Sequence, residues 1–184
     1  SVNGKKTNTD EIARLLKKQK IVAVFNGKAE GGPRALGNRS ILFDPTNKNA
    51  KEIVNRVKKR EWYRPFAASI LKENFSEFFL TNGLKESKFM TISFQSKTSE
   101  IPGVVHVDNS CRVQTVTKDI PHLYNLLKDF EKYRNVPVLL NTSFNMAGEA
   151  LVETVEDAIL TFKNTEIDVL WFPEINEILT KEDL

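Results

Sequence analysis

Apolar residues recur along the chain at helical spacing in some segments and in short continuous runs in others. Where apolar positions follow one another at three or four residues, one face of a helix is apolar and an amphipathic helix is expected. In residues 47–60, Ala50, Ile53, Val54 and Val57 fall on one such face. The pattern predicts helices over residues 8–19, 47–60, 74–80, 120–133 and 154–162, with Asn8, Thr46, Asp119 and Thr154 as caps of four of them.

The short apolar runs between these helices predict buried strands. Val113, Thr115 and Thr117 alternate with Arg112, Gln114 and Val116, as the two faces of a strand do. Because strands and helices alternate without an internal repeat or a linker, we expect one α/β domain with a layered sheet and a core of about residues 10–172. Strands are expected over residues 21–25, 40–43, 67–71, 89–95, 112–117, 137–140 and 167–172, and residues 173–184 are expected to form a polar tail.

Composition narrows the class of protein. The chain has 184 residues, of which 40% are hydrophobic and 28% charged, which suits a folded domain and excludes a disordered one. No apolar run approaches the roughly 20 residues of a membrane-spanning helix. The single cysteine, Cys111, excludes an internal disulfide and is expected to be a small buried residue. His106 and His122 show no metal-ligand spacing, and a reducing, cytoplasmic setting is expected.

Net charge gives little information about the ligand. With 27 basic and 24 acidic residues the chain carries +3, too little to indicate nucleic acid binding by itself. A small basic excess equally suits a pocket for anionic small molecules. The chain begins with Ser1 rather than Met, so we expect a processed, tagged or excised piece of a longer chain.

A glycine-rich stretch, residues 27–42, directly follows the first predicted strand. Its glycines allow a positive φ and a close approach of the backbone, and it contains Arg34 and Arg39. Backbone N–H groups and guanidinium groups together suit a phosphate or a carboxylate. The alternative is a tight turn with two solvated arginines, because the stretch is neither a Walker A loop nor a dinucleotide fingerprint.

Three further segments with polar and basic residues lie at predicted strand ends, where α/β folds place their ligands. Clustered cations repel one another unless an anion is bound between them, so several of them together predict one polyanion site. The segments are residues 58–66, residues 106–108 with 112–115, and residues 141–145.

Four ordered motifs resemble the C-terminal domain of the NodU/CmcH/TobZ carbamoyltransferases. The resemblance extends from about Asp10 to Phe172, and it departs from the family at Gly31, usually a bulky residue, and at Ala68, mostly proline. The motifs are Glu30–Ser40, Lys59–Glu61 with Arg64–Ala67, Arg112–Val116, and Leu139–Asn145 with Gly148–Glu149.

The resemblance implies a YrdC-like fold, an open twisted mixed α/β sheet flanked by helices around a cationic central cavity. It implies binding of ATP and carbamoyl phosphate and formation of carbamoyl-adenylate, with Mg²⁺ held mainly by the nucleotide phosphates. A separate N-terminal Kae-like domain, absent from this chain, would pass the carbamoyl group to an acceptor hydroxyl. Neither a protein-held metal, a membrane nor nucleic acid is expected as a partner, and no transfer to the acceptor is expected from this chain alone.

Residue by residue, the resemblance assigns catalytic roles to Lys58, Arg64 and Arg112, with Lys59 as the alternative to Lys58. Other readings stay open for several of these residues: Arg39 could pair with Glu30 or Asp44, Lys58 could be a solvated helix end, and His106 could pair with Asp108 for structure alone. Ser143 and Asn145 could cap a turn. The residues assigned to substrate or nucleotide binding are Arg34, Arg39, Lys59, His106, Thr142, Ser143 and Asn145.

Two other functions remain open at this point. The same basic concavity could belong to a non-catalytic module that binds a nucleotide or RNA. It could also belong to a fragment that is inactive without its N-terminal half. The acceptor substrate would be chosen by residues outside this chain.

Overall fold

The computed structural model describes residues 2–27 and 35–184. Within these residues ten strands form one open sheet in the order β1-β10-β9-β2-β3-β8-β4-β7-β6-β5. The pairs β2–β9 and β4–β7 are parallel and the other neighbours are antiparallel, so the sheet is mixed, as expected. The strands are β1 (Lys5–Lys6), β2 (Val22–Phe25), β3 (Arg39–Phe43), β4 (Ala67–Leu71), β5 (Phe79–Leu80), β6 (Ser93–Ser96), β7 (Ser110–Val116), β8 (Val138–Ser143), β9 (Val169–Phe172) and β10 (Glu177–Thr180).

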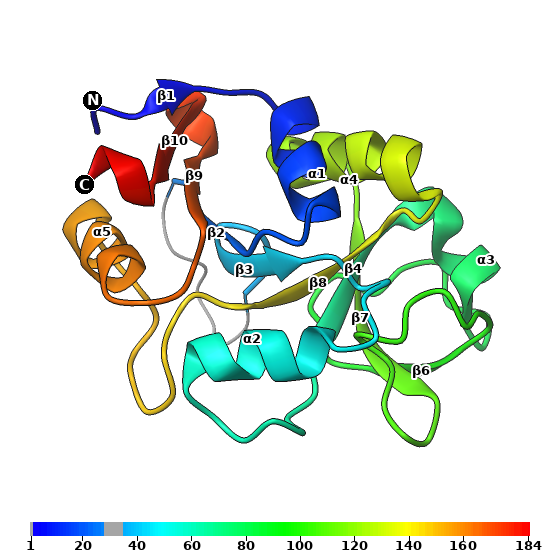
Figure 1. The fold of residues 1–184 in the computed structure, drawn as a ribbon. Coiled ribbons are helices and arrows are strands. Elements are labelled where there is room, and N and C mark those ends of the chain that lie inside the picture. The colour runs from blue at the N-terminus through cyan, green and yellow to red at the C-terminus, as the bar shows by residue number, and fades with distance from the viewer. Residues whose placement is uncertain (1, 28–34) are drawn as a thin grey trace.

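Helices cover both faces of the sheet (Figure 1). On one face α1 and α4 pack against each other, and Leu16 and Leu127 join the same buried cluster as Leu139 of the sheet. On the other face Val54 of α2 and Phe162 of α5 belong to a second buried cluster. The α-helices are α1 (Thr9–Lys17), α2 (Ala50–Lys58), α3 (Phe75–Phe78), α4 (Pro121–Arg134) and α5 (Val155–Lys163).

Two of the four predicted helix caps are confirmed. The backbone N–H of Glu11 donates to Asn8 Oδ1 at 2.9 Å, and Thr154 forms a capping box with Asp157. The caps predicted at Thr46 and Asp119 are wrong, because α2 begins after Asn49 and α4 after Ile120. The Thr46 hydroxyl instead donates to the buried carboxylate of Asp44.

The carboxyl-terminal segment is not the polar tail that the sequence predicts. Residues 177–180 form β10, which pairs with β9 on one side and with the two-residue β1 on the other. Ile178 and Leu179 are buried, and the structure extends the core beyond residue 172. The predicted strand over residues 89–95 is shorter at its start, because Phe89 is exposed and β6 begins at Ser93.

The end of β8 lies at the centre of the sheet, between β3 and β4. Ser143 pairs with Ser40 near the start of β3, and Asn141 pairs with Ala67 at the start of β4. Because β7 is parallel to β4, its early residues reach the same edge. Four strands therefore bring polar residues together where β8 ends.

No helix within the described residues is long and apolar enough to cross a membrane.

Candidate functional site

The ammonium group of Lys58 is enclosed by oxygen atoms at the end of β8. Its Nζ donates to Thr142 Oγ1 at 3.2 Å, to the Ser143 carbonyl at 2.8 Å, to Ser143 Oγ at 3.1 Å and to Asn145 Oδ1 at 3.2 Å. Ser143 Oγ in turn donates to Asn145 Oδ1 at 2.6 Å. These contacts join the end of α2 to the segment that follows β8, although 84 or more residues separate them in sequence.

Helix geometry explains why Lys58 faces inward. Lys58 lies four residues after Val54 on the buried face of α2, and its side chain is 2% exposed. Lys59 follows in the left-handed conformation with a φ of 56°, ends the helix and is exposed. Burial, followed by the positive charge of Arg60, lowers the pKa of Lys58 to about 7.

A hollow of about 530 Å³ opens beside this cluster. Four basic residues and a single carboxylate line it together with Ser143 and Asn145, so the hollow favours anions. Arg64, more than half exposed, donates to Glu61 at 3.0 Å across its rim. The charged residues of the lining are Lys58, Lys59, Arg60, Glu61 and Arg64.

Arg60 is held in place by its neighbours. Its Nε donates to Asn55 Oδ1 at 2.6 Å, and its guanidinium lies 4.6 Å from the centroid of the Phe66 ring. Asn55 is fully buried, and its amide donates to the carbonyls of Trp62 and Arg64, which fixes the loop after α2. Burial, with the charge of Arg64, lowers the pKa of Arg60.

A second, smaller cavity of about 120 Å³ adjoins the hollow. Arg60 and Ser143 line both spaces, and the small cavity adds Arg112 from β7 and Asn141 from β8. Ala35, within the glycine-rich stretch, also lines this cavity. Within the described residues the guanidinium of Arg112 makes no hydrogen bond or ion pair.

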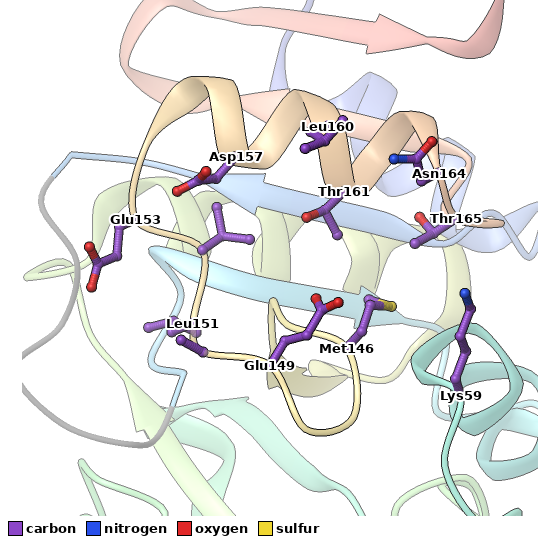
Figure 2. A pocket seen from close by; sticks show the side chains of 12 residues that line it. Lys59, Met146, Glu149, Leu151, Glu153, Asp157, Leu160, Thr161, Asn164 and Thr165 are labelled. Carbon is purple, nitrogen blue, oxygen red and sulfur yellow. The ribbon is translucent and has the colours of Figure 1, made fainter.

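A third space of about 480 Å³ lies on the α5 side of Lys59 and Met146. Figure 2 shows Asp157, Leu160 and Thr161 on α5 facing Glu149 and Met146 of the segment after β8. Glu149, Glu153 and Asp157 give this space an acidic lining, which repels phosphate. Among these three spaces, the one beside Lys58 is therefore best suited to a phosphorylated ligand.

The structure brings together seven of the residues that the sequence assigns to the site. They contact the Lys58 cluster or line the two adjoining spaces, and they come from α2, the loop after it, β7 and the end of β8. These residues are Lys58, Lys59, Arg64, Arg112, Thr142, Ser143 and Asn145.

Arg39 is buried between β3 and the backbone segments next to it. It is 2% exposed, and its guanidinium lies 3.5 Å from the centroid of the Phe25 ring. Of its two expected partners, Glu30 lies outside the described residues, and Asp44 accepts hydrogen bonds from Arg134 and Gln19. Arg39 donates to the carbonyls of Asn26, Gly27, Asn38, Val152 and Glu153, which ties β3 to the segments around it.

His106 is not brought to the hollow or to the small cavity. Burial and the nearby charge of Lys51 hold its pKa below the usual value. Asp108 accepts hydrogen bonds from the backbone and the hydroxyl of Ser110, rather than from His106. Residues 28–34 of the glycine-rich stretch, which include Arg34, lie outside the described residues. Cys111 is buried as expected, with its pKa raised by burial to about 12.

The residue-by-residue assignment left out two lining residues, Arg60 and Asn141, although both lie in segments that the sequence places at the site. Arg60 lines both spaces, and Asn141 lines the small cavity in contact with Ser69 and Gln114. The sequence carried a signal for both Arg60 and Asn141. Arg60 belongs to the basic run after α2, and Asn141 is a polar residue that directly continues a buried apolar strand.

Comparisons with known proteins agree on one family. Nodulation protein NolO of Bradyrhizobium diazoefficiens is 44% identical over 156 residues, which cover 82% of this chain and 28% of NolO. Nodulation protein U of Azorhizobium caulinodans is 32% identical over 180 residues, covering 94% of this chain and 32% of that protein. The chain thus spans about a third or less of the length of these relatives.

Two solved structures share the fold at low sequence identity. Full-length HypF in its phosphate- and nucleotide-bound form matches with a TM-score of 0.63 at 19% identity, over 90% of this chain and 27% of HypF. A variant of P. abyssi Sua5 matches with a TM-score of 0.60 at 12% identity, over 92% of this chain and 48% of Sua5. These likenesses confirm the expected YrdC-like α/β fold.

The family described as "Carbamoyltransferase C-terminus" matches residues 13–179, which is nearly the whole folded core. Together with the relatives, this match establishes that the chain belongs to the carbamoyltransferase C-terminal domain family.

Proposed function

We propose that this chain binds ATP and carbamoyl phosphate and forms carbamoyl-adenylate, as the C-terminal part of an ATP-dependent O-carbamoyltransferase. The observation that carries the proposal is the enclosed Lys58 ammonium, held by Thr142, Ser143 and Asn145 beside a hollow with three more cations. Such a cluster is costly without an anion, and phosphate oxygens relieve the repulsion by charge-assisted hydrogen bonds.

The sizes of the two adjoining spaces suggest which substrate each of them binds. The hollow of about 530 Å³ has the size of a pocket for a nucleotide-sized ligand and presents cations to its phosphates. The cavity of about 120 Å³ admits only a group of a few heavy atoms, such as a carbamoyl group. Because Arg60 and Ser143 line both, they would contact the point where the two substrates meet.

The proposed chemistry needs no nucleophile from the protein. Hydrolysis of carbamoyl phosphate yields carbamate and phosphate, and a carbamate oxygen then attacks the α-phosphorus of ATP. The bond from the α-phosphorus to the bridging oxygen breaks, and pyrophosphate leaves. Lys58, Arg64 and Arg112 would orient the anions and stabilise the charge on the transferred group, which is how phosphoryl-transfer sites generally act.

Magnesium would enter with the nucleotide rather than bind a site of the protein. No group of three histidine, cysteine or carboxylate side chains in residues 2–27 and 35–184 could hold a metal ion. The lining of the hollow also carries only one carboxylate, Glu61. Nucleotide phosphates with bound water supply the oxygen ligands that Mg²⁺ prefers.

Transfer to an acceptor would depend on a domain outside this chain. The relatives are roughly three to four times as long as the part that the chain matches. We propose that an N-terminal domain of the same protein takes up the carbamoyl group and chooses the acceptor.

The test is carbamoyl-phosphate-dependent exchange of labelled pyrophosphate into ATP. We expect exchange by the wild-type chain, alone or joined to its N-terminal domain, and a fall of about 10- to 100-fold in Ser143→Ala and in Arg64→Ala, because each loses a contact to a phosphate. Arg56→Ala is the matched control, since Arg56 is an exposed arginine of α2 that pairs with Glu166. It is expected to leave exchange unchanged.

Other outcomes would favour the alternatives. Exchange that persists at wild-type rates in both variants would contradict the site. Exchange that requires the N-terminal domain would indicate a fragment that is inactive alone. RNA binding with a steep salt dependence and without exchange would indicate a binding module.

A further inference from the structure

Three polar side chains form a buried network beneath the small cavity, one from each of three neighbouring strands. Ser69 of β4 donates to Gln114 Oε1 at 2.7 Å. The amide nitrogen of Asn141 on β8 donates to Ser69 Oγ at 2.9 Å and to Gln114 Oε1 at 3.3 Å. Each of the three residues is at most 1% exposed.

The orientation of the Asn141 amide follows from a backbone carbonyl. Gln114 Nε2 donates to the carbonyl of Leu36 at 2.9 Å, and a carbonyl can only accept. The other end of the Gln114 amide must therefore be its oxygen, which accepts the one hydrogen of the Ser69 hydroxyl. Ser69 Oγ can then only accept from Asn141, which turns the nitrogen of Asn141 toward the network and its oxygen away from it.

The oxygen of Asn141 is the unsatisfied atom of the group. Among the described residues Oδ1 has no hydrogen-bond partner, although less than 1 Å² of it is exposed. A buried acceptor without a donor is rare and unfavourable, because it has lost water without replacement. Asn141 also lines the small cavity together with Arg112, whose guanidinium itself has no partner in the described part of the chain.

We propose that Asn141 Oδ1 accepts a hydrogen bond from the amino group of the carbamoyl substrate, and so selects carbamoyl groups over acyl groups with a methyl in that place. The inference deepens the proposed function and rests on it. An acceptor and a cation that line the same small cavity match a carbamoyl group, which has an N–H donor and an electron-rich oxygen. Arg112 can turn aside to admit the ligand without breaking a contact to another described residue.

A methyl group in place of the amino group cannot donate, so it would leave Oδ1 unsatisfied in the bound state. Sites built to hydrogen-bond a substrate reject analogues that lack the bonding group more strongly than sites that discriminate by size alone. Asn141 is thus a specificity-determining residue, whereas Lys58 and Arg64 hold phosphate and would not distinguish the two acyl groups.

The test compares two stable phosphonates by calorimetry with the chain: phosphonoacetamide, which carries the amino group, and 2-oxopropylphosphonate, which carries a methyl in its place. We expect wild-type protein to bind phosphonoacetamide at least about tenfold more tightly. In Asn141→Ala we expect this ratio to fall close to one, with the affinity for inorganic phosphate unchanged.

Ser96→Ala is the matched control, because Ser96 is also a buried serine but lies outside both the network and the cavity lining. It is expected to keep the wild-type ratio. Equal binding of the two phosphonates by wild-type protein, or no binding of either, would overturn the inference without any variant. An unchanged ratio of the two phosphonate affinities in folded Asn141→Ala would also overturn the inference. Selective binding of the amide without pyrophosphate exchange would instead refute the proposed reaction and leave the role of Asn141 standing.

Discussion

Burial separates Lys58 from the lysine that follows it. The two are adjacent in sequence, but Lys58 lies on the inner face of α2 among four oxygen atoms, whereas Lys59 ends the helix in solvent. Loss of hydration makes the charged form of Lys58 more costly and brings its pKa to about 7. A bound anion has the opposite effect, since it stabilises the ammonium form.

Anion binding should therefore depend on pH through Lys58. Below about pH 7 the side chain is an ammonium group and attracts an anion; above that value it loses its proton and its charge. Sulfate, whose charge is constant over this range, should bind more weakly as pH rises from 7 to 9, by up to about tenfold per unit. Titration calorimetry at several pH values measures this slope.

Two variants separate the adjacent lysines. Lys58→Met should bind sulfate weakly and lose the slope above pH 7. Lys59→Met should keep the slope, because Lys59 is exposed and outside the oxygen cluster. A slope that disappears in Lys59→Met and persists in Lys58→Met would show that Lys59, and not Lys58, contacts the anion.

At the scale of elements, the two edges of the sheet were harder to predict than its centre. Strands β2, β4 and β8 are short apolar runs buried on both faces, and such runs are recognisable in sequence. Strand β10 has only four residues in a stretch rich in charges, and β1 has two lysines. Their pairing is a contact between the two ends of the chain, which no local pattern reveals.

The buried character of β10 can be tested by a core truncation. Leu179 is 2% exposed within β10, so Leu179→Ala should lower the free energy of unfolding by about 2–5 kcal/mol. Leu184→Ala is the control, because Leu184 is about half exposed, and it should change stability by less than about 0.5 kcal/mol. Urea unfolding measures both, and equal effects would be inconsistent with a paired, buried β10.

The helix caps also show that a local sequence pattern does not always predict a structural role. Asn8 and Thr154 cap because each precedes its helix directly and the third residue on offers its N–H. Thr46 has similar chemistry, but its hydroxyl is used by Asp44, whose carboxylate also binds Arg134 from α4. A hydroxyl that donates to a neighbouring carboxylate in this way does not cap the helix.

For the whole molecule, the site depends on segments from three separate regions of the sequence. The end of α2, the loop after it, the start of β7 and the end of β8 converge on the hollow and the small cavity. A ligand that joins these segments stabilises the folded state in proportion to its affinity and its excess. ATP should therefore protect the entire domain from unfolding.

At a concentration of ATP about 100 times its dissociation constant, the stabilisation should be about 2.7 kcal/mol. For a domain of this size that corresponds to a rise in Tm of about 5–10 °C. Lys58→Met should lose most of the rise, whereas Arg56→Met, altered at an exposed pair on the same helix, should keep it. A thermal shift series measures the effect, and a rise that is equal in all three proteins would place ATP elsewhere.

The sequence by itself determined the alternation of helices and strands, the α/β class and seven residues that the structure gathers at the end of β8. These follow from local periodicity and from the placement of polar residues at strand ends, and both can be recognised in short stretches of sequence.

Tertiary structure decided which of these residues face a ligand. It placed Lys58 inside and Lys59 outside, engaged Arg39 with five carbonyl groups, and left the oxygen of Asn141 without a donor in the described structure. Burial and hydrogen-bond partners come from contacts between segments far apart in sequence. A linear pattern can name the polar groups, but only packing determines which of them are already satisfied.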